Sequence, residues 1–209
     1  SIRNNLITDN IASGNGGGIM LSGYPSDGSL GTNIWNNTIA DNYASGDGGG
    51  VYFDYLYKVL VANSIIYNNS PNSLDQSTSG DVNTSTFNHC DIEDGNLPTT
   101  PPNNYGTFDD DPDFNGEHKV HASTSPCIDA GNNSYYVENY DIEGVDRILN
   151  TYIDIGAFEN DGNNPYIILP WNLSLQDNNK SANSVECTIY PNPFISKTNI
   201  NLVLPVDCR

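Results

Sequence analysis

Two stretches near the start of the chain repeat each other almost residue for residue. Residues 4–21 read NNLITDNIASGNGGGIML and residues 36–53 read NNTIADNYASGDGGGVYF, an offset of 32 without a gap. A looser copy, NSIIYN, occupies 63–68, and NHCDIE at 88–93 is a more divergent fourth. Repeats with a period of roughly 20 to 50 residues indicate an architecture of stacked units. This repeat therefore constrains the fold more than any other feature.

The first three copies share the frame N-x-I-x-x-N, at Asn5–Asn10, Asn37–Asn42 and Asn63–Asn68, with no helical pattern between the copies. Short strands at this spacing predict an all-β fold, a parallel β-helix in which each repeat is one coil of a solenoid. We expect one buried column to contain Ile7, Ile39, Ile65 and Cys90. We expect an amide ladder at a bend, where it satisfies backbone groups left by the turn, to contain Asn10, Asn42 and Asn68.

The triple glycines that end the two long copies predict a tight corner that a Cβ atom would obstruct. A phosphate-binding loop is the alternative, but it requires a following helix and usually a lysine. Strand-like residues follow instead, Ile-Met-Leu in one copy and Val-Tyr-Phe in the other. The additional residues around 24–31 are expected to form a loop on one side of the solenoid.

The composition excludes several classes of protein. Helix-forming residues are scarce, whereas Asn, Asp and Gly, which favour turns, are abundant. The chain has 7 Lys and Arg against 26 Asp and Glu, a net charge of −19. This balance argues against nucleic acid or an anionic membrane surface as a partner. The sequence contains no run of about 18 apolar residues, so it predicts no membrane span.

Further motifs follow the repeats in one order: DPDF at 111–114, SPCIDAGNN at 125–133, DIEGVDR at 141–147 and DIGAFE at 154–159. Together with the repeats, they resemble secreted right-handed parallel β-helix proteins of the pectate-lyase-like superfamily, in particular bacterial surface proteins of the "choice-of-anchor Q" type. The resemblance covers about residues 4–160 and implies a right-handed β-helix in that range. It also implies an extracellular or outer-surface location, and some related β-helices cleave or bind polysaccharides.

The end of the chain carries a second resemblance. TIYPNPF at 188–194 and the alternating TNINLVLP at 198–205 are similar to the start of a Bacteroidetes type IX secretion sorting domain. This resemblance implies recognition by secretion machinery. We expect residues 185–209 to be a truncated, sorting-domain-like β segment and the polar residues 161–184 to be a linker or an end cap. The chain is expected to be a fragment of a longer secreted protein.

Four cysteines offer no C-x-x-C pair, so a common zinc site is not expected. Cys90 and Cys127 lie in strand-like contexts and are expected to be buried thiols. Cys187 and Cys208 bracket the terminal segment and could pair, but spacing does not choose among the pairings.

The densest acidic stretch predicts a calcium site. Asp111, Asp113 and Asn115 place oxygen ligands at alternate positions before a glycine, although Ala122 stands where a calcium loop has its bidentate glutamate. The alternative is that Asp111 begins a turn before Pro112. No other cofactor is expected.

Two further clusters have both a functional and a structural interpretation. Trp35, Tyr52 and Tyr55 are candidates for stacking on sugar rings, or else they belong to the core or to stacked ladders. Around Arg147 lie the acidic residues Asp141, Glu143, Asp146, Asp154 and Glu159. Arg147 either neutralises a carboxylate and holds the terminal turns together, or two of the carboxylates act as in glycoside hydrolysis.

No complete catalytic set accompanies these clusters, so we assign no catalytic residue. The expected function is a secreted or cell-surface stalk or adhesin segment, with a polysaccharide or cell-surface glycan as candidate partner. One alternative is a polysaccharide lyase or glycoside hydrolase whose active site lies partly in further coils. Another alternative is a spacer without a ligand.

Overall fold

A computed structural model describes residues 1–23, 31–54, 59–77, 85–94, 104–120, 124–136 and 138–160. Within these ranges the protein is all-β and contains no helix. The chain divides into two units, Ser1–Pro165 and Tyr166–Arg209. The second unit lies outside the described residues, as do the predicted loop around 24–31, the linker at 161–184 and the segment at 185–209.

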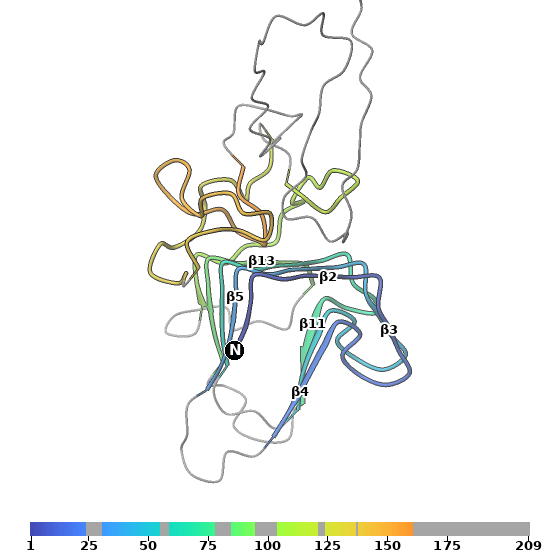
Figure 1. The fold of residues 1–209 in the computed structure, drawn as a ribbon. Helices are drawn as coiled ribbons and strands as arrows, with labels where there is room; N and C mark the ends of the chain where they lie inside the picture. The colour runs from blue at the N-terminus through green and yellow to red at the C-terminus, as the bar shows by residue number, and fades with distance from the viewer. Residues whose placement is uncertain are drawn as a thin grey trace, which may run out of the picture. The chain divides into compact units, whose positions relative to one another are not determined.

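The strands form four sheets in which all pairings between named strands are parallel (Figure 1). The five-stranded sheet contains, in order, β1 (Ile2–Arg3), β5 (Thr32–Trp35), β9 (Val59–Ala62), β12 (Thr86–Asn88) and β14 (Asn104–Tyr105). The four-stranded sheet contains β2 (Leu6–Thr8), β6 (Thr38–Ala40), β10 (Ile65–Tyr67) and β13 (Asp91–Ile92). The three-stranded sheet contains β4 (Ile19–Ser22), β8 (Val51–Asp54) and β11 (Leu74–Gln76), and the two-stranded sheet contains β3 (Ile11–Ala12) and β7 (Tyr43–Ala44).

In each sheet, adjacent strands come from successive repeats of the sequence, and β14 of the five-stranded sheet follows the fourth repeat. We define repeat 1 as residues 2–22, repeat 2 as 32–54, repeat 3 as 59–76 and repeat 4 as 86–92. The chain passes through the sheets in the same order in repeats 1 and 2, from β1 to β4 and from β5 to β8. In Figure 1 the strands of one sheet lie one behind another. This parallel, in-register arrangement is compatible with the predicted solenoid.

The register of the four-stranded sheet corrects the predicted isoleucine column. Ile7 pairs with Ile39, Ile39 with Ile66, and Ile66 with Ile92. The prediction that placed Ile65 and Cys90 in this column is therefore wrong. In repeat 3 the equivalent residue comes one position later than the N-x-I-x-x-N frame suggested, because repeat 3 follows repeat 2 at an offset of 27 here.

The sequence frame selected Ile65 instead of Ile66 because both faces of β10 are buried. Ile66 belongs to the main core, which also contains Ile39 and Phe87. Ile65 belongs to a second core with Val120, Cys127 and Ile155, which come from the segment after the repeats. Successive side chains of a strand point to opposite faces, so one of the two isoleucines must face this later segment.

An amide ladder runs through the repeats as predicted, but its third member differs. Asn10 Nδ2 donates to Asn42 Oδ1 at 2.9 Å, and Asn42 Nδ2 donates to Asn69 Oδ1 at 2.9 Å. The placement of Asn68 in the ladder is wrong, since its side chain is exposed and donates to Asp41. The same shift of one residue that moves Ile66 into the core moves Asn69 into the ladder. We name Asn10, Asn42 and Asn69 the long ladder.

A second polar ladder lies at the preceding bend and was not predicted. It contains Asn5, Asn37, Ser64 and Cys90, which we name the short ladder. Asn5 Nδ2 donates to Asn37 Oδ1 at 3.0 Å, and Ser64 Oγ accepts from the backbone N–H of Asn37 at 3.2 Å. Each member also donates to the carbonyl two residues before it. Cys90 therefore takes a turn position in repeat 4 and not the interior isoleucine position.

Each described ladder member follows a residue in the left-handed backbone conformation. The φ angles are 57° at Asn4, 55° at Asn36, 46° at Asn63 and 52° at His89 before the short ladder, and 59° at Asp9, 57° at Asp41 and 54° at Asn68 before the long ladder. Asn and Asp tolerate this conformation better than most residues do. The abundance of Asn and Asp thus has a positional cause. One residue adopts the left-handed conformation that turns the chain, and the side chain of the next forms hydrogen bonds with backbone groups of the turn.

The triple glycines form close contacts between repeats, as predicted for the corner. Gly48 has a φ angle of +63°, and a Cβ atom on Gly49 would lie 2.2 Å from the carbonyl oxygen of Ser70 in the next repeat. Backbones approach here too closely for any side chain. This contact explains why glycines recur at this corner in repeats 1 and 2.

Candidate functional site

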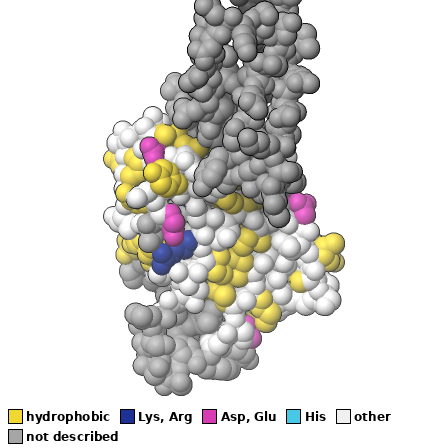
Figure 2. All heavy atoms as spheres, in the orientation of Figure 1, with side chains coloured by type: hydrophobic (Ala, Val, Ile, Leu, Met, Phe, Trp, Pro, Cys, Tyr) yellow, Lys and Arg dark blue, Asp and Glu magenta, His cyan; other side chains and the backbone are white. Residues whose placement is uncertain are grey.

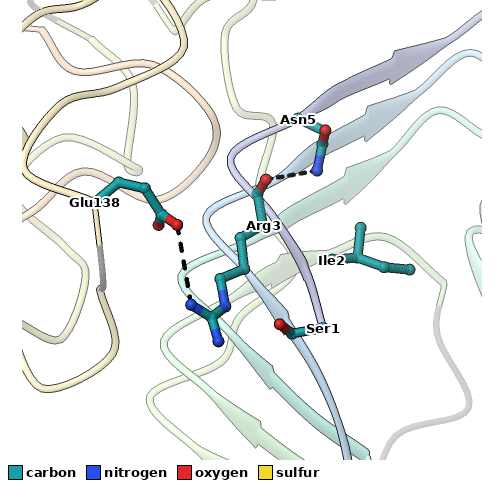
Figure 3. A pocket seen from close by; sticks show the side chains of 5 residues that line it. All are labelled: Ser1, Ile2, Arg3, Asn5 and Glu138. Carbon is teal, nitrogen blue, oxygen red and sulfur yellow. Dashed lines mark hydrogen bonds and ion pairs between the residues drawn. The ribbon is translucent and has the colours of Figure 1, made fainter.

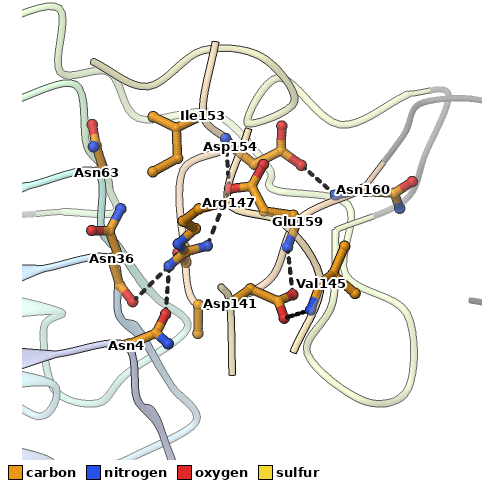
Figure 4. A network of polar contacts seen from close by, with 12 residues as sticks. Asn4, Asn36, Asn63, Asp141, Val145, Arg147, Ile153, Asp154, Glu159 and Asn160 are labelled. Carbon is orange, nitrogen blue, oxygen red and sulfur yellow. Dashed lines mark hydrogen bonds and ion pairs between the residues drawn. The ribbon is translucent and has the colours of Figure 1, made fainter. Parts of the chain in front are cut away.

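The segment after the repeats places a buried arginine against the bend that contains Asn4 and Asn36 (Figure 4). Arg147 is 2% exposed, and its Nη1 lies 3.1 Å from Glu159 Oε1. Its Nη2 donates to Asn4 Oδ1 at 2.8 Å and to the carbonyl oxygen of Gly156 at 2.9 Å. One side chain thus connects the DIGAFE motif with the turns of repeats 1 and 2.

Three buried carboxylates surround Arg147, and backbone N–H groups occupy their oxygens. Asp141 accepts from the N–H groups of Glu143, Val145 and Glu159. Asp154 accepts from the N–H groups of Asp129 and Asn160, at 2.7 Å each. These bonds compensate for the removal of carboxylates from water, because buried charge needs both hydrogen bonds and a counter-charge.

Burial dominates the electrostatics of this cluster. It raises the pKa of Asp154 to about 7, and the Arg147 guanidinium opposes the shift. Burial and the neighbouring Asp154 carboxylate also raise the pKa of Glu159. Acids with raised pKa values are sometimes catalytic. Here the side chains of Asp141, Asp154 and Glu159 are at most 5% exposed and already bonded.

The cluster supports the structural interpretation of Arg147, which neutralises a carboxylate and holds the terminal turns against the repeats. Close packing accompanies it: Gly156, at a φ angle of +115°, donates its N–H to the carbonyl of Asn63. Ala157 N–H donates to Thr38 Oγ1 at 3.0 Å. Glu143 and Asp146 of the same predicted cluster are less buried, and Glu143 pairs with Lys119 at 2.6 Å.

The three predicted calcium ligands lie close in sequence and form turn contacts. Asp111 Oδ1 accepts from the N–H of Asp113 at 2.9 Å. Asn115 Oδ1 accepts from the N–H groups of Glu117 and Lys119, and Asp113 accepts from the hydroxyl of Thr124. In the described ranges no three His, Cys, Asp or Glu side chains gather as a metal site would require. These oxygens serve as turn acceptors.

The structure does not bring the three candidate aromatic residues to one site. Trp35 lies in β5 of the five-stranded sheet, and Tyr52 lies in β8 of the three-stranded sheet. Tyr55 lies outside the described residues. Trp35 contacts two other groups instead: its ring meets that of Tyr135 edge-on at 5.7 Å, and the Arg3 guanidinium lies 5.2 Å from its centroid.

An open hollow of about 500 Å³ lies beside these residues (Figure 3). Its lining contains Ser1, Ile2, Arg3, Asn5 and Glu138. Arg3 Nη1 is 3.9 Å from Glu138 Oε1, and both side chains are partly exposed. Figure 2 shows one face of the molecule, on which basic side chains appear at one place with acidic and hydrophobic side chains beside them.

Sequence reasoning missed the partners of Trp35. Tyr135, which meets the Trp35 ring, and Glu138, which pairs with Arg3, lie about a hundred residues later in the chain, and no motif connects them to Trp35. Trp35 Nε1 and Arg3 Nε are buried without a hydrogen-bond partner among the described residues. Two N–H donors thus remain unpaired among the described residues, one in the Trp35 ring and one on the arginine that lies over it.

His118 is partly buried and has a carboxylate partner. His118 Nε2 lies 2.6 Å from Asp41 Oδ2, and the imidazole ring meets Phe114 edge-on at 5.8 Å. Asp41 is the turn residue that precedes the long ladder in repeat 2. The contact attaches the loop around His118 to that turn. His121 lies outside the described residues.

The buried cysteines agree with the predicted thiols. Cys90 and Cys127 are free and buried. Burial raises the pKa of Cys90 to about 12 and raises the pKa of Cys127 as well. Cys127 Sγ lies 3.2 Å from Asp91 Oδ2, in the second core. Thiols of this kind are poor nucleophiles, because the reactive form is the thiolate.

Comparisons with known proteins identify no relative. No protein-family model, no curated protein and no solved structure matches this chain. Among the described residues no helix is long and apolar enough to cross a membrane.

Proposed function

We propose that this chain is a segment of an exported bacterial surface protein in which a right-handed parallel β-helix serves as a stalk. The observation that carries the proposal is the pair of polar ladders, because their members bond from repeat to repeat in one direction. Each added repeat presents the same acceptors to its neighbour. A fold extended in this way gains length in one direction, which suits a spacer that holds another part away from a surface.

The resemblance of residues 4–160 to surface β-helices supports the location, and the TIYPNPF motif supports export by a type IX pathway. The charge is consistent with a soluble extracellular face, since acids exceed bases by 19. The Arg147 cluster supports a structural role, because its carboxylates are bonded to the backbone and closed to a substrate.

Protease treatment of intact cells that express the full-length protein tests the location. The proposal predicts that external protease removes the protein while a cytoplasmic marker survives. Deletion of residues 188–209 should leave the protein inside the cell if this segment carries the sorting signal. Protection of the intact protein in unbroken cells would contradict the proposal.

Glycan binding beside Trp35 is a second candidate function. One observation favours it: the charged pair of Arg3 and Glu138 lines the hollow, and the Arg3 guanidinium lies over the Trp35 ring, which also meets Tyr135. Aromatic faces and paired charged side chains are what sugar rings and hydroxyl groups contact. Binding at this place would make the stalk an adhesin segment.

A glycan array with the 209-residue chain tests this second candidate. Trp35→Ala should abolish any saturable binding. Tyr43→Ala, which removes an exposed aromatic side chain on the two-stranded sheet, should leave it unchanged. No binding to any glycan would leave the spacer alternative. Release of reducing ends or of unsaturated uronate by the full-length protein would instead favour a lyase or hydrolase.

A further inference from the structure

Two Asn-Gly pairs occur in the sequence, Asn15-Gly16 and Asn115-Gly116. In such a pair the peptide nitrogen of the glycine can attack the side-chain amide of the asparagine, because no Cβ atom on the second residue obstructs the approach. We propose that the fold suppresses this reaction at Asn15 and permits it at Asn115, which makes Asn115 a site of self-modification. The inference requires neither export nor glycan binding.

The first pair is held at the glycine corner between repeats 1 and 2. Gly16 N–H donates to the carbonyl oxygen of Asp47 at 3.0 Å, and Asn15 Oδ1 accepts from the N–H of Asp47 at 2.9 Å. A Cβ atom on Gly16 would lie 2.7 Å from the carbonyl oxygen of Ile19, so the backbone is closely packed. Because the attacking nitrogen is already bonded, reaction at Asn15 requires the corner to open first.

The second pair lies in the loop between Phe114 and Val120, which form an antiparallel bridge. Asn115 and Gly116 are both exposed. Gly116 N–H has no hydrogen-bond acceptor within the described part of the chain. A Cβ atom on Gly116 would meet nothing within 4 Å, so the space beside this glycine is open. The attacking nitrogen is thus free at Asn115 and occupied at Asn15.

Two backbone groups hold the amide that is attacked. Asn115 Oδ1 accepts from the N–H of Glu117 at 2.8 Å and from the N–H of Lys119 at 3.2 Å. When the Gly116 nitrogen attacks Cγ, negative charge develops on this oxygen, and two N–H donors already in place stabilise the tetrahedral intermediate. The Nδ2 atom, which must leave, donates to no group among the residues that the structure describes.

The reaction consumes only water. Gly116 N forms a bond to Asn115 Cγ, the bond from Cγ to Nδ2 breaks, and the proton lost from Gly116 N, carried by water, leaves with Nδ2 as ammonia. The product is a cyclic succinimide. Water then opens the ring at Cγ to give aspartate, or at the main-chain carbonyl carbon to give isoaspartate, in which the backbone passes through Cβ and Cγ. No group is oxidised or reduced.

The loop attaches to two other parts of the protein, so a change at Asn115 acts on both. His118 Nε2 lies 2.6 Å from Asp41 Oδ2 in repeat 2, and Lys119 Nζ lies 2.6 Å from Glu143 Oε1 in the segment after the repeats. The backbone N–H of Asn115 also closes the loop by donating to the Lys119 carbonyl at 2.8 Å. Isoaspartate lengthens this backbone and adds a negative charge, so it should weaken both attachments.

Incubation of the 209-residue chain in neutral to mildly alkaline buffer, followed by protease digestion and mass spectrometry, tests the proposal. The fragment that contains Asn115 should lose ammonia and gain water roughly tenfold faster than the fragment that contains Asn15. The same incubation in concentrated guanidinium chloride should bring the two rates together, because both pairs are then free. Equal rates in the folded protein, or an unchanged difference in denaturant, would overturn the assignment.

Gly116→Ala is the matched variant, because its Cβ atom has open space and the backbone there is not left-handed. It should slow the modification of Asn115 roughly tenfold and leave the rate at Asn15 unchanged. Trypsin cleavage after Lys119 reports the loosening: aged natural protein should be cut faster than fresh protein, whereas the aged variant should match the fresh one. Equal cleavage of fresh and modified natural protein would contradict the weakened attachments. If the variant does not fold, the comparison of the two asparagines in the natural chain still decides the proposal.

Discussion

Arg147 Nη1 lies 3.1 Å from Glu159 Oε1, and each of the two side chains is only 1% exposed. This ion pair lies between the DIGAFE motif and the turns of the first two repeats. Because both groups have left water, each depends on the other and on the bonds around them. The pair thus attaches the terminal segment to the first two repeats at one place.

Arg147→Met should destabilise the protein by about 3–5 kcal/mol, since it leaves Glu159 buried without its counter-charge. Urea denaturation followed by circular dichroism gives the free energy of unfolding. Arg3→Met is the matched control: Arg3 pairs with Glu138 at 3.9 Å with both side chains partly exposed, so the loss should be about 1 kcal/mol or less. Similar small losses for both variants would show that the buried pair does not hold the segment.

Gly156→Ala should be more destabilising than Gly144→Ala, although both glycines have positive φ angles, +115° and +87°. A Cβ atom at Gly156 would lie 2.9 Å from Thr38 Oγ1 and 3.0 Å from Ile65 Cδ1, whereas one at Gly144 meets nothing within 4 Å. Overpacking of this kind costs about 1–3 kcal/mol beyond the backbone strain that the variants share. Equal melting temperatures would refute the packing of this motif against repeats 2 and 3.

The parallel stacking and the step of the long ladder from Asn10 to Asn42 could be predicted from the sequence, because both recur at fixed positions in repeats 1 and 2. The register of repeat 3 was not predictable in the same way. Two adjacent isoleucines fit the frame there, and only the second core, built from residues more than fifty positions later, decides which one faces inward. The single-residue error in Ile65 and Asn68 follows from that long-range contact.

The candidate sites differed in the same respect. The structural role of Arg147 was one of two interpretations that the sequence left open, because few cations stand beside many acids. The surroundings of Trp35 were not predictable, since Tyr135 and Glu138 belong to no recognisable pattern. The short ladder was not predicted from the sequence, because its members change from Asn to Ser to Cys. These residues share a hydrogen-bonding position and not a residue type.

The stability of the protein should decrease as pH rises toward neutrality, in part because of Asp91. Burial raises the pKa of Asp91 to about 7, well above the value of about 4 for an unfolded chain. The native state therefore binds the proton more tightly. The stabilisation is complete below about pH 4, declines as pH rises to about 7 and then stays constant.

Asp91→Asn removes this contribution, because the amide does not titrate. Urea midpoints measured from about pH 5 to pH 8 should decline less steeply in the variant than in the natural protein. Asp154 and Glu159, whose pKa values are also raised, contribute in the same direction, so some slope should remain. A variant with an unchanged slope would show that Asp91 is not the group involved.

Successive repeats stack in the register set by the long ladder. A double-mutant cycle on Asn42 and Asn69 tests it most directly, with free energies of unfolding from urea titration. Asn42→Ala alone should cost about 1–3 kcal/mol, because it leaves buried backbone groups unpaired. The cycle should give a coupling energy of about 0.5–3 kcal/mol between Asn42 and Asn69, whereas the same cycle with Asn68 in place of Asn69 should give nearly none. Coupling of Asn42 to Asn68 but not to Asn69 would contradict the register and the stacking built on it.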